Sequence, residues 1–413
     1  MLLFDRFTLE NGLRILVHQD KNTPMVAVNI LYQVGSRDEN PEKTGFAHLF
    51  EHLMFGGSVN IPNYDNPLQY AGGDNNAFTN NDFTNYYLTI PKNNLETAFW
   101  LESDRMLSLG FSEKSMDVQR QVVIEEFKQN YLNQPYGDVY LLMKPLAYKV
   151  HPYQWNTIGK DIQHIEMATM QDVKSFYNKY YNPNNAILCV AGNVELDEIK
   201  KLAEKWFGPI SSGEAFHRHY PEEPLQIDAR RLEVEKPVPQ NAFYMAWHMP
   251  KRKEKVYYAC DLISDILSTG NSSRLYQKLV KEKQWLSEVQ AYITGDLDGG
   301  LLVISGKLFN STDFKTVENG ILEEMDRLLK EPVGERELQK VKNKAEANLV
   351  FSEISILGKA MGLSYFEMLG DAQLFNEEAE NYRSVTVQDI QNAMKEFFTE
   401  EKMNILYYKA KNN

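Results

Sequence analysis

Cysteine is scarce in this sequence: only Cys189 and Cys260 occur among its 413 residues. Both lie within apolar runs, and no C-x-x-C pair is present. This scarcity excludes a disulfide framework and argues against a zinc–thiolate site. We therefore expect two buried free thiols.

Long hydrophobic runs are also missing. No segment approaches the roughly 20 apolar residues that a membrane-spanning helix needs. At the N-terminus, Asp5 and Arg6 follow directly after Met1-Leu2-Leu3-Phe4, which leaves no apolar region for a signal peptide. We therefore expect a soluble, cytoplasmic protein with no membrane partner.

Positive charge is in the minority. The chain has 44 Lys and Arg residues against 57 Asp and Glu residues, a net charge of -13 and a pI near 5.2. This balance argues against nucleic acid or an anionic membrane as the main partner. Hydrophobic residues make up 43% of the chain, which is enough for full cores, and the length favours two domains.

Histidine is rare, yet two of the eight histidines lie four residues apart in His48-Leu49-Phe50-Glu51-His52. Apolar residues recur around them at helical spacing, Thr44-Gly45 can begin a helix, and Gly56-Gly57 can end it. On such a helix both imidazoles share one face and can bind one zinc ion. Glu51 lies on the same side and can act as a general base. The order H-x-x-E-H is the inverse of the commoner H-E-x-x-H zinc-protease motif.

A catalytic zinc ion needs a third protein ligand. The apolar spacing over residues 115–128 predicts a second helix, and Glu125 and Glu126 lie at the border of its apolar side. The pattern alone favours neither glutamate as the ligand. Two histidines and a carboxylate would suit manganese or cobalt as well as zinc.

Further motifs follow one another along the chain: Asn11-Gly12-Leu13, Val34-Gly35-Ser36, the His48 to His52 motif, Gly72 to Thr79 with Asp82 and Tyr86-Tyr87, and Arg120 to Phe127. With these motifs the chain resembles a family of zinc peptidases, the inverzincins. The family includes pitrilysin, insulin-degrading enzyme and mitochondrial processing peptidase, and the resemblance is to its short, two-domain bacterial type. It covers most of the N-terminal half closely and the C-terminal half loosely.

The resemblance implies a complete active site. In the family the second glutamate of the E-E pair binds the metal, which implies Glu126 here, with Glu125 as the alternative if the register shifts by one. The implied function is a zinc-dependent endopeptidase acting on peptides or unfolded protein segments. Glu51 would be the general base for a zinc-bound water.

The resemblance also implies how substrate is bound. Asn76, Ala77, Phe78 and Thr79 match an edge strand beside the metal. An extended peptide could add to such an edge through backbone hydrogen bonds.

Two departures from the family pattern affect what we expect. Gln119 stands where the family has a glutamate, which removes a charge that would support the metal ligands. In the second half, Lys281 and Glu288 stand where active members have an arginine and a tyrosine that hold substrate, whereas Arg274 and Tyr276 match a structural position.

From the second departure we expect a homodimer, or a heterodimer with a related subunit that supplies the Arg/Tyr pair. The alternative function is a non-catalytic or partner-dependent subunit that holds substrate in a peptidase complex.

The chain contains a repeat at an offset of 217 residues. Thr169-Met170-Gln171-Asp172-Val173 recurs as Thr386-Val387-Gln388-Asp389-Ile390, and each predicts a Thr-capped helix that leads into a strand. Between the repeats, residues 207–239 are rich in Pro, Gly, Ser and charge. We therefore expect a zinc-binding catalytic domain at 1–216, a linker at 217–236 and a related domain without a metal motif at 237–413.

Both halves mix helices and strands. Helical periodicity occurs at 95–107, 256–267 and 337–349, and strand-like alternation at 14–18, 26–32 and 301–304. This predicts an α+β fold of two homologous domains, each an antiparallel-rich sheet with helices packed on it. The resemblance implies that the two domains face each other across a cleft.

Overall fold

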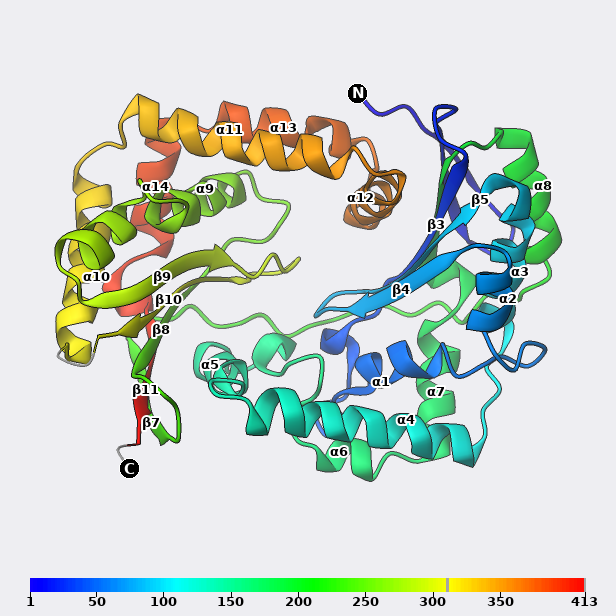
Figure 1. Cartoon of the computed structure of the whole chain (residues 1–413), viewed down its shortest axis with the longest axis horizontal. Helices are drawn as coiled ribbons and strands as arrows, with labels where there is room; N and C mark the ends of the chain where they lie inside the picture. Colours follow the sequence, from blue (N-terminus) through cyan, green and yellow to red (C-terminus); the bar gives the residue numbers. More distant parts are fainter. Residues whose placement is uncertain (310–311, 412–413) are drawn as a thin grey trace. The chain divides into compact units, whose positions relative to one another are not determined.

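The computed structural model describes residues 1–309 and 312–411. The chain divides into two compact units, each an α+β layer structure of its own (Figure 1). The predicted α+β class with two related domains is confirmed. Unit 1 comprises Met1–Lys128, Trp155–Tyr220 and Val350–Glu377, and unit 2 comprises Gln129–Gln154, Pro221–Leu349 and Glu378–Asn413.

Unit 1 is built on a six-stranded mixed sheet in the order β1-β2-β6-β3-β5-β4. Only β2 and β6 run parallel, and the other pairs are antiparallel. The central strand β6 is buried along its whole length, so it lacks the alternation of a strand with one wet face. The strands are β1 (Asp5–Thr8), β2 (Arg14–Gln19), β3 (Met25–Tyr32), β4 (Asp74–Thr79), β5 (Thr84–Pro91) and β6 (Ala186–Gly192).

Helices cover both faces of this sheet. Figure 1 shows α3 and α8 on one side and α12 on the other, where α12 contacts β2, β3 and β6. The helix α1 packs against α4, α7 and the edge strand β4. The helices of unit 1 are α1 (Phe46–Leu53), α2 (Asp65–Tyr70), α3 (Leu95–Leu107), α4 (Glu113–Glu126), α6 (Gln163–Glu166), α7 (Met170–Tyr180), α8 (Leu196–Trp206) and α12 (Ile356–Leu369).

Unit 2 repeats this plan with a five-stranded sheet in the order β7-β11-β8-β10-β9. Only β7 and β11 run parallel. One face packs on α9, α10 and α14 and the other on α5, and each face has its own apolar cluster. The strands are β7 (Arg230–Lys236), β8 (Ala242–His248), β9 (Leu286–Ile293), β10 (Leu301–Leu308) and β11 (Asn404–Ala410), and the helices are α5 (Val139–Ala147), α9 (Val256–Ser268), α10 (Phe314–Lys330) and α14 (Val387–Phe397).

Two helices and one π-helical segment cross the unit boundaries along the chain. They are α11 (Glu335–Ser352), α13 (Leu374–Ser384) and the segment Phe127–Asn133 that continues α4.

The repeat at an offset of 217 residues is visible in the elements. Thr169 caps α7 and Thr386 caps α14, and in both helices the third residue, Asp172 or Asp389, bonds back to complete a capping box. Each helix leads into an inner strand of its sheet, β6 or β11. The predicted helix-then-strand repeat is therefore present in both units.

The units are not the two contiguous segments that we expected. The segment Gln129–Gln154, with α5, belongs to unit 2, and Val350–Glu377, with α12, belongs to unit 1. Each half of the sequence thus contributes one helix to the other unit. The helix α5 covers one face of the sheet of unit 2, and α12 covers one face of the sheet of unit 1. In addition, β7 lies inside the expected linker 217–236. Its residues alternate between half-buried and exposed, and its backbone pairs in parallel with β11.

The two cysteines and the lengths of the apolar helices bear on two expectations from the sequence. Cys189 and Cys260 are free and buried, as expected. Among the described residues, no single helix is long and apolar enough to cross a membrane, and the bent pair α11–α12 meets that test only when its two helices are taken together.

Candidate metal centre

The N-terminus of the helix α1 is capped by a buried carboxyl group from outside the helix. Its N-cap residue, Gly45, has φ of 92° and no side chain with which to cap the helix. Instead Glu39 accepts the N–H of Gly45 at 2.9 Å and that of Ala47 at 2.8 Å. Burial raises the pKa of Glu39 to about 8, although these two donors act in the opposite direction. The sequence analysis missed this residue.

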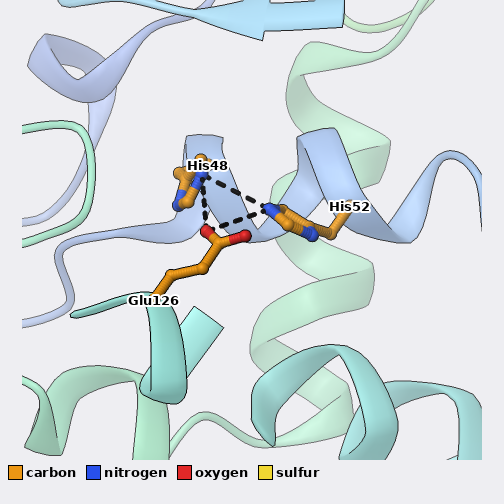
Figure 2. Close-up of side chains that lie close together, drawn as sticks. All are labelled: His48, His52 and Glu126. Carbon is orange, nitrogen blue, oxygen red and sulfur yellow. Dashed lines mark hydrogen bonds and ion pairs between the residues drawn. The ribbon is translucent and has the colours of Figure 1, made fainter. Parts of the chain in front are cut away.

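Three side chains converge between α1 and α4. His48 and His52 come from α1, one turn apart, and Glu126 comes from the last residue of α4 (Figure 2). The two Nε2 atoms are 3.3 Å apart, and Oε2 of Glu126 is 3.5 Å from each of them. Among the described residues this is the one group of three potential ligands that could hold a metal ion.

The triangle has the size that a zinc ion requires. Zinc–ligand bonds of about 2.0–2.1 Å in tetrahedral geometry separate the ligand atoms by about 3.3–3.4 Å. The donor set of two imidazoles and one carboxylate is also one that zinc prefers. The residues present therefore fit a metal ion with three protein ligands.

The protonation state of His48 agrees with this fit. Burial, and after it the neighbouring His52, lowers the pKa of His48 to about 4. The imidazole is thus neutral near pH 7, which is the form that binds metal.

Glu125 and Glu126 have opposite environments although they are neighbours in sequence. Glu125 is exposed and forms an ion pair with Lys128 at 2.8 Å. Glu126 is only 35% exposed in its side chain and faces both histidines. The structure thus brings Glu126, and not Glu125, to His48 and His52. Gln119 lies two helical turns before Glu126 on the same side of α4.

Glu51 lies close enough to His52 and Glu126 for their charges to act on its carboxyl, and it is not one of the three candidate ligands. Burial raises the pKa of its carboxyl, and hydrogen bonds from the side chain and backbone of Thr79 act against that rise. Thr79 is the last residue of β4, so the edge strand and the proposed base meet at this point.

The strand β4 carries the four residues expected to bind substrate. Asn76, Ala77, Phe78 and Thr79 all lie in it, and it is an edge strand that pairs only with β5. Asn76 and Phe78 are exposed, whereas Ala77 and Thr79 are half-buried. The expected edge strand beside the histidine helix is therefore present.

The residues singled out in the second half have other partners. Glu288, in β9, forms an ion pair with Lys307 at 3.0 Å, and the Lys281 ammonium lies 5.8 Å from the ring centre of Tyr276. Arg274 forms two hydrogen bonds with Glu337, at 3.0 and 2.8 Å. Arg274 thus ties two segments of unit 2 together, which fits the structural position expected for it.

The duplicated α+β fold, with two histidines and a glutamate gathered in its first unit, is the arrangement that the resemblance to zinc peptidases implied. Comparison of the sequence with family models identifies the family. A model described as Insulinase (Peptidase family M16) matches residues 14–145, and one described as Peptidase M16 inactive domain matches residues 168–345. The chain belongs to peptidase family M16.

Individual relatives agree with this assignment. Zinc protease PqqE of Helicobacter pylori is 29% identical over 412 residues, which cover 97% of this chain and 92% of that protein. The crystal structure of a protease from Helicobacter pylori superposes with a TM-score of 0.94 at 28% identity, and covers 99% of this chain and 100% of that one. A peptidase M16 inactive domain from Pseudomonas fluorescens has a TM-score of 0.86 at 19% identity, with 100% and 98% covered, and shows the same fold.

Proposed function

We propose that this protein is a zinc-dependent endopeptidase. The observation that carries the proposal is the triangle of His48, His52 and Glu126 with Glu51 beside it, since the triangle has the dimensions of a zinc site. Relatives named zinc proteases support the same class of reaction.

Each residue of the site has a distinct task. When bound, zinc would supply Lewis-acid activation of a water molecule and of the peptide carbonyl. Glu51 accepts the proton of the attacking water at its carboxylate and later donates it to the leaving amine. Burial of Glu51 favours a carboxyl that can hold that proton between the two steps.

The edge strand β4 supplies the binding surface for substrate. An extended peptide adds to it as a further strand, so that recognition rests on backbone hydrogen bonds and not on one particular side chain. Peptides and unfolded protein segments fit this mode, whereas a folded chain has few free backbone groups to offer.

Cleavage of a quenched fluorescent peptide library by the purified chain tests the proposal. Activity should be abolished by a chelator, and Glu51→Gln should lower it about 100-fold or more while the variant retains its metal. Equal turnover by Glu51→Gln would remove Glu51 from the role of base. A folded, metal-loaded chain that cleaves nothing would contradict an endopeptidase that works alone.

A second candidate function is a subunit that needs a partner in order to cleave. It is favoured by Lys281 and Glu288, which stand where active family members have the arginine and tyrosine that hold substrate. A second copy of this chain, or a related subunit, would then complete the site. The match of residues 168–345 to the M16 inactive domain is consistent with this role.

A further inference from the structure

The hydrogen-bonding pattern of the β4–β5 hairpin decides which backbone groups of β4 face outward. At the turn, the N–H of Asn80 donates to the carbonyl of Phe83 at 3.0 Å. In an antiparallel pair, bonded and non-bonded residues alternate. With the register Phe78↔Asn85 and Asn76↔Tyr87, the backbone groups of Phe78 and Asn76 therefore point to β5. Those of Asn75, Ala77 and Thr79 point away from it, to the open edge.

Two of these three outward N–H groups already have partners within the chain. The N–H of Ala77 donates to Oδ1 of Asn76 at 2.8 Å. The N–H of Thr79 bonds to the carboxylate of Glu51. The edge that an extended peptide would use is thus partly blocked by side chains of this protein.

We propose that the carboxamide of Asn76 is a displaceable cap on the edge of β4, which competes with an incoming peptide for the N–H of Ala77. The inference rests on the proposed function, because it concerns the same binding edge. Asn76 is exposed, so its side chain can rotate away when a peptide carbonyl takes its place. Asn76 therefore acts by occupying the edge and not by holding the substrate.

The physical reason for such a cap is the risk that an open edge carries. Unpaired N–H and C=O groups on an edge strand are a template for pairing with another chain. A side-chain oxygen satisfies the N–H of Ala77 while the edge is empty. An incoming strand displaces this oxygen, because the strand forms several backbone hydrogen bonds at once.

Substitutions at Asn76 test this idea in opposite directions. The probe is a short fluorescein-labelled peptide of Ala, Lys and Thr, titrated by anisotropy into the Glu51→Gln protein, which should not cleave it. Asn76→Ala removes the cap and should bind the peptide about threefold to tenfold more tightly. Asn76→Asp keeps a stronger acceptor and should bind it more weakly than the Asn76 protein does.

Two controls isolate the cap. Gln171→Ala, in α7 and outside the binding edge, removes an exposed side-chain hydrogen bond to Ser175 of 3.2 Å and should leave the affinity unchanged. A peptide with proline at alternate positions lacks the N–H groups needed for strand addition and should not respond to any substitution at Asn76.

The opposite result would overturn the inference. If Asn76 holds the substrate directly, Asn76→Ala and Asn76→Asp both weaken binding, because both remove the carboxamide donor. Cleavage by the protein that retains Glu51 is measured in parallel. Cleavage together with weaker binding by Asn76→Ala refutes the cap alone, whereas tighter binding without cleavage refutes the peptidase proposal alone.

Discussion

At the scale of single residues, the candidate metal site combines a local helix motif with one glutamate that is placed by helix packing. The i and i+4 spacing of His48 and His52 is a local property. In α1 it brings the two Nε2 atoms to 3.3 Å from each other. Glu125 and Glu126 differ by about 100° around α4, and which of them faces α1 depends on how two helices pack. Only the family resemblance indicated Glu126 before the structure did.

The pair Glu125 and Glu126 gives a matched test. Glu126→Gln removes the anionic ligand, so the purified variant should retain less than about a tenth of the zinc bound by the unaltered protein. Glu125→Gln breaks only an exposed ion pair with Lys128 and should retain full metal. Metal analysis after dialysis distinguishes the two, and equal zinc in both variants would exclude Glu126 as a ligand.

Glu39 shows what a sequence motif leaves out. It lies six residues before Gly45, across an irregular segment, and its carboxylate replaces the missing N-cap side chain of α1. Capping rules predict a polar residue at the N-cap itself, so a cap supplied from a distance gives no local signal.

A partly buried histidine in unit 2 makes stability depend on pH. Burial lowers the pKa of His248 to about 4, and its Nε2 atom has no hydrogen-bond partner among the described residues. The groups that face it are the Tyr148 ring, Glu223, Arg230, His151 and the backbone of Ala147. The native state therefore holds this imidazole neutral.

The sign of the effect follows from the lowered pKa. Between pH 6.5 and pH 4 the unfolded chain binds the proton and the native one does not, so the free energy of unfolding falls as the pH falls. His248 should account for up to about 3 kcal/mol of that loss. Denaturant unfolding of the protein at pH 4.5 and pH 7 should show a smaller difference for His248→Gln than for the exposed control His217→Gln. Identical pH dependence in the two would refute the assignment.

At the scale of elements, local patterns predicted what each segment forms but not where it packs. The helix expected at 95–107 is α3 with the same limits, and those expected at 256–267 and 337–349 lie within α9 and α11. The strands β2, β3 and β10 were also found from alternation. Periodicity describes the face of an element, but it does not say which sheet covers that face. The sequence patterns therefore could not predict in which unit α5 and α12 pack.

A buried polar cluster helps to hold α12 on the sheet of unit 1. The side chain of Asn29 donates to Ser364 of α12 at 2.9 Å and exchanges hydrogen bonds with Asn85 of β5, and all three residues are at most 1% exposed. These polar groups satisfy one another only when α12 lies in this register.

Ser364→Ala tests this register. It leaves one N–H of Asn29 buried without an acceptor, which should lower the free energy of unfolding by about 1–3 kcal/mol. Ser175→Ala, on the exposed side of α7, should change it by less than about 0.5 kcal/mol. Denaturant unfolding of unit 1 measures both, and a neutral Ser364→Ala would show that the cluster adds nothing to the docking of α12.

At the scale of the whole molecule, the duplication could be predicted from the sequence. The packing of α5 in unit 2 and of α12 in unit 1 could not. The two capping boxes and the strands that follow them kept their spacing, because each is a local unit of the fold. Among the described residues, the candidate metal ligands occur in unit 1 alone. One half therefore carries the candidate chemistry, while the other repeats the fold without it.

If the missing arginine and tyrosine come from a second chain, activity should depend on assembly. Peptidase activity per mole of chain should then rise with protein concentration, or on addition of a related subunit, over the range in which sedimentation shows a dimer forming. A constant activity per mole from a monomer would refute the need for a partner.

Because α12 packs on the sheet of unit 1, one face of that sheet cannot be covered until late in synthesis on the ribosome. The strands of unit 1 all lie before Tyr220, but the helix that covers one face of their sheet is made roughly 150 residues later. At about 5–20 residues per second, that apolar face stays uncovered for about 8–30 s during synthesis. During that time the N-terminal half exposes apolar surface that favours aggregation.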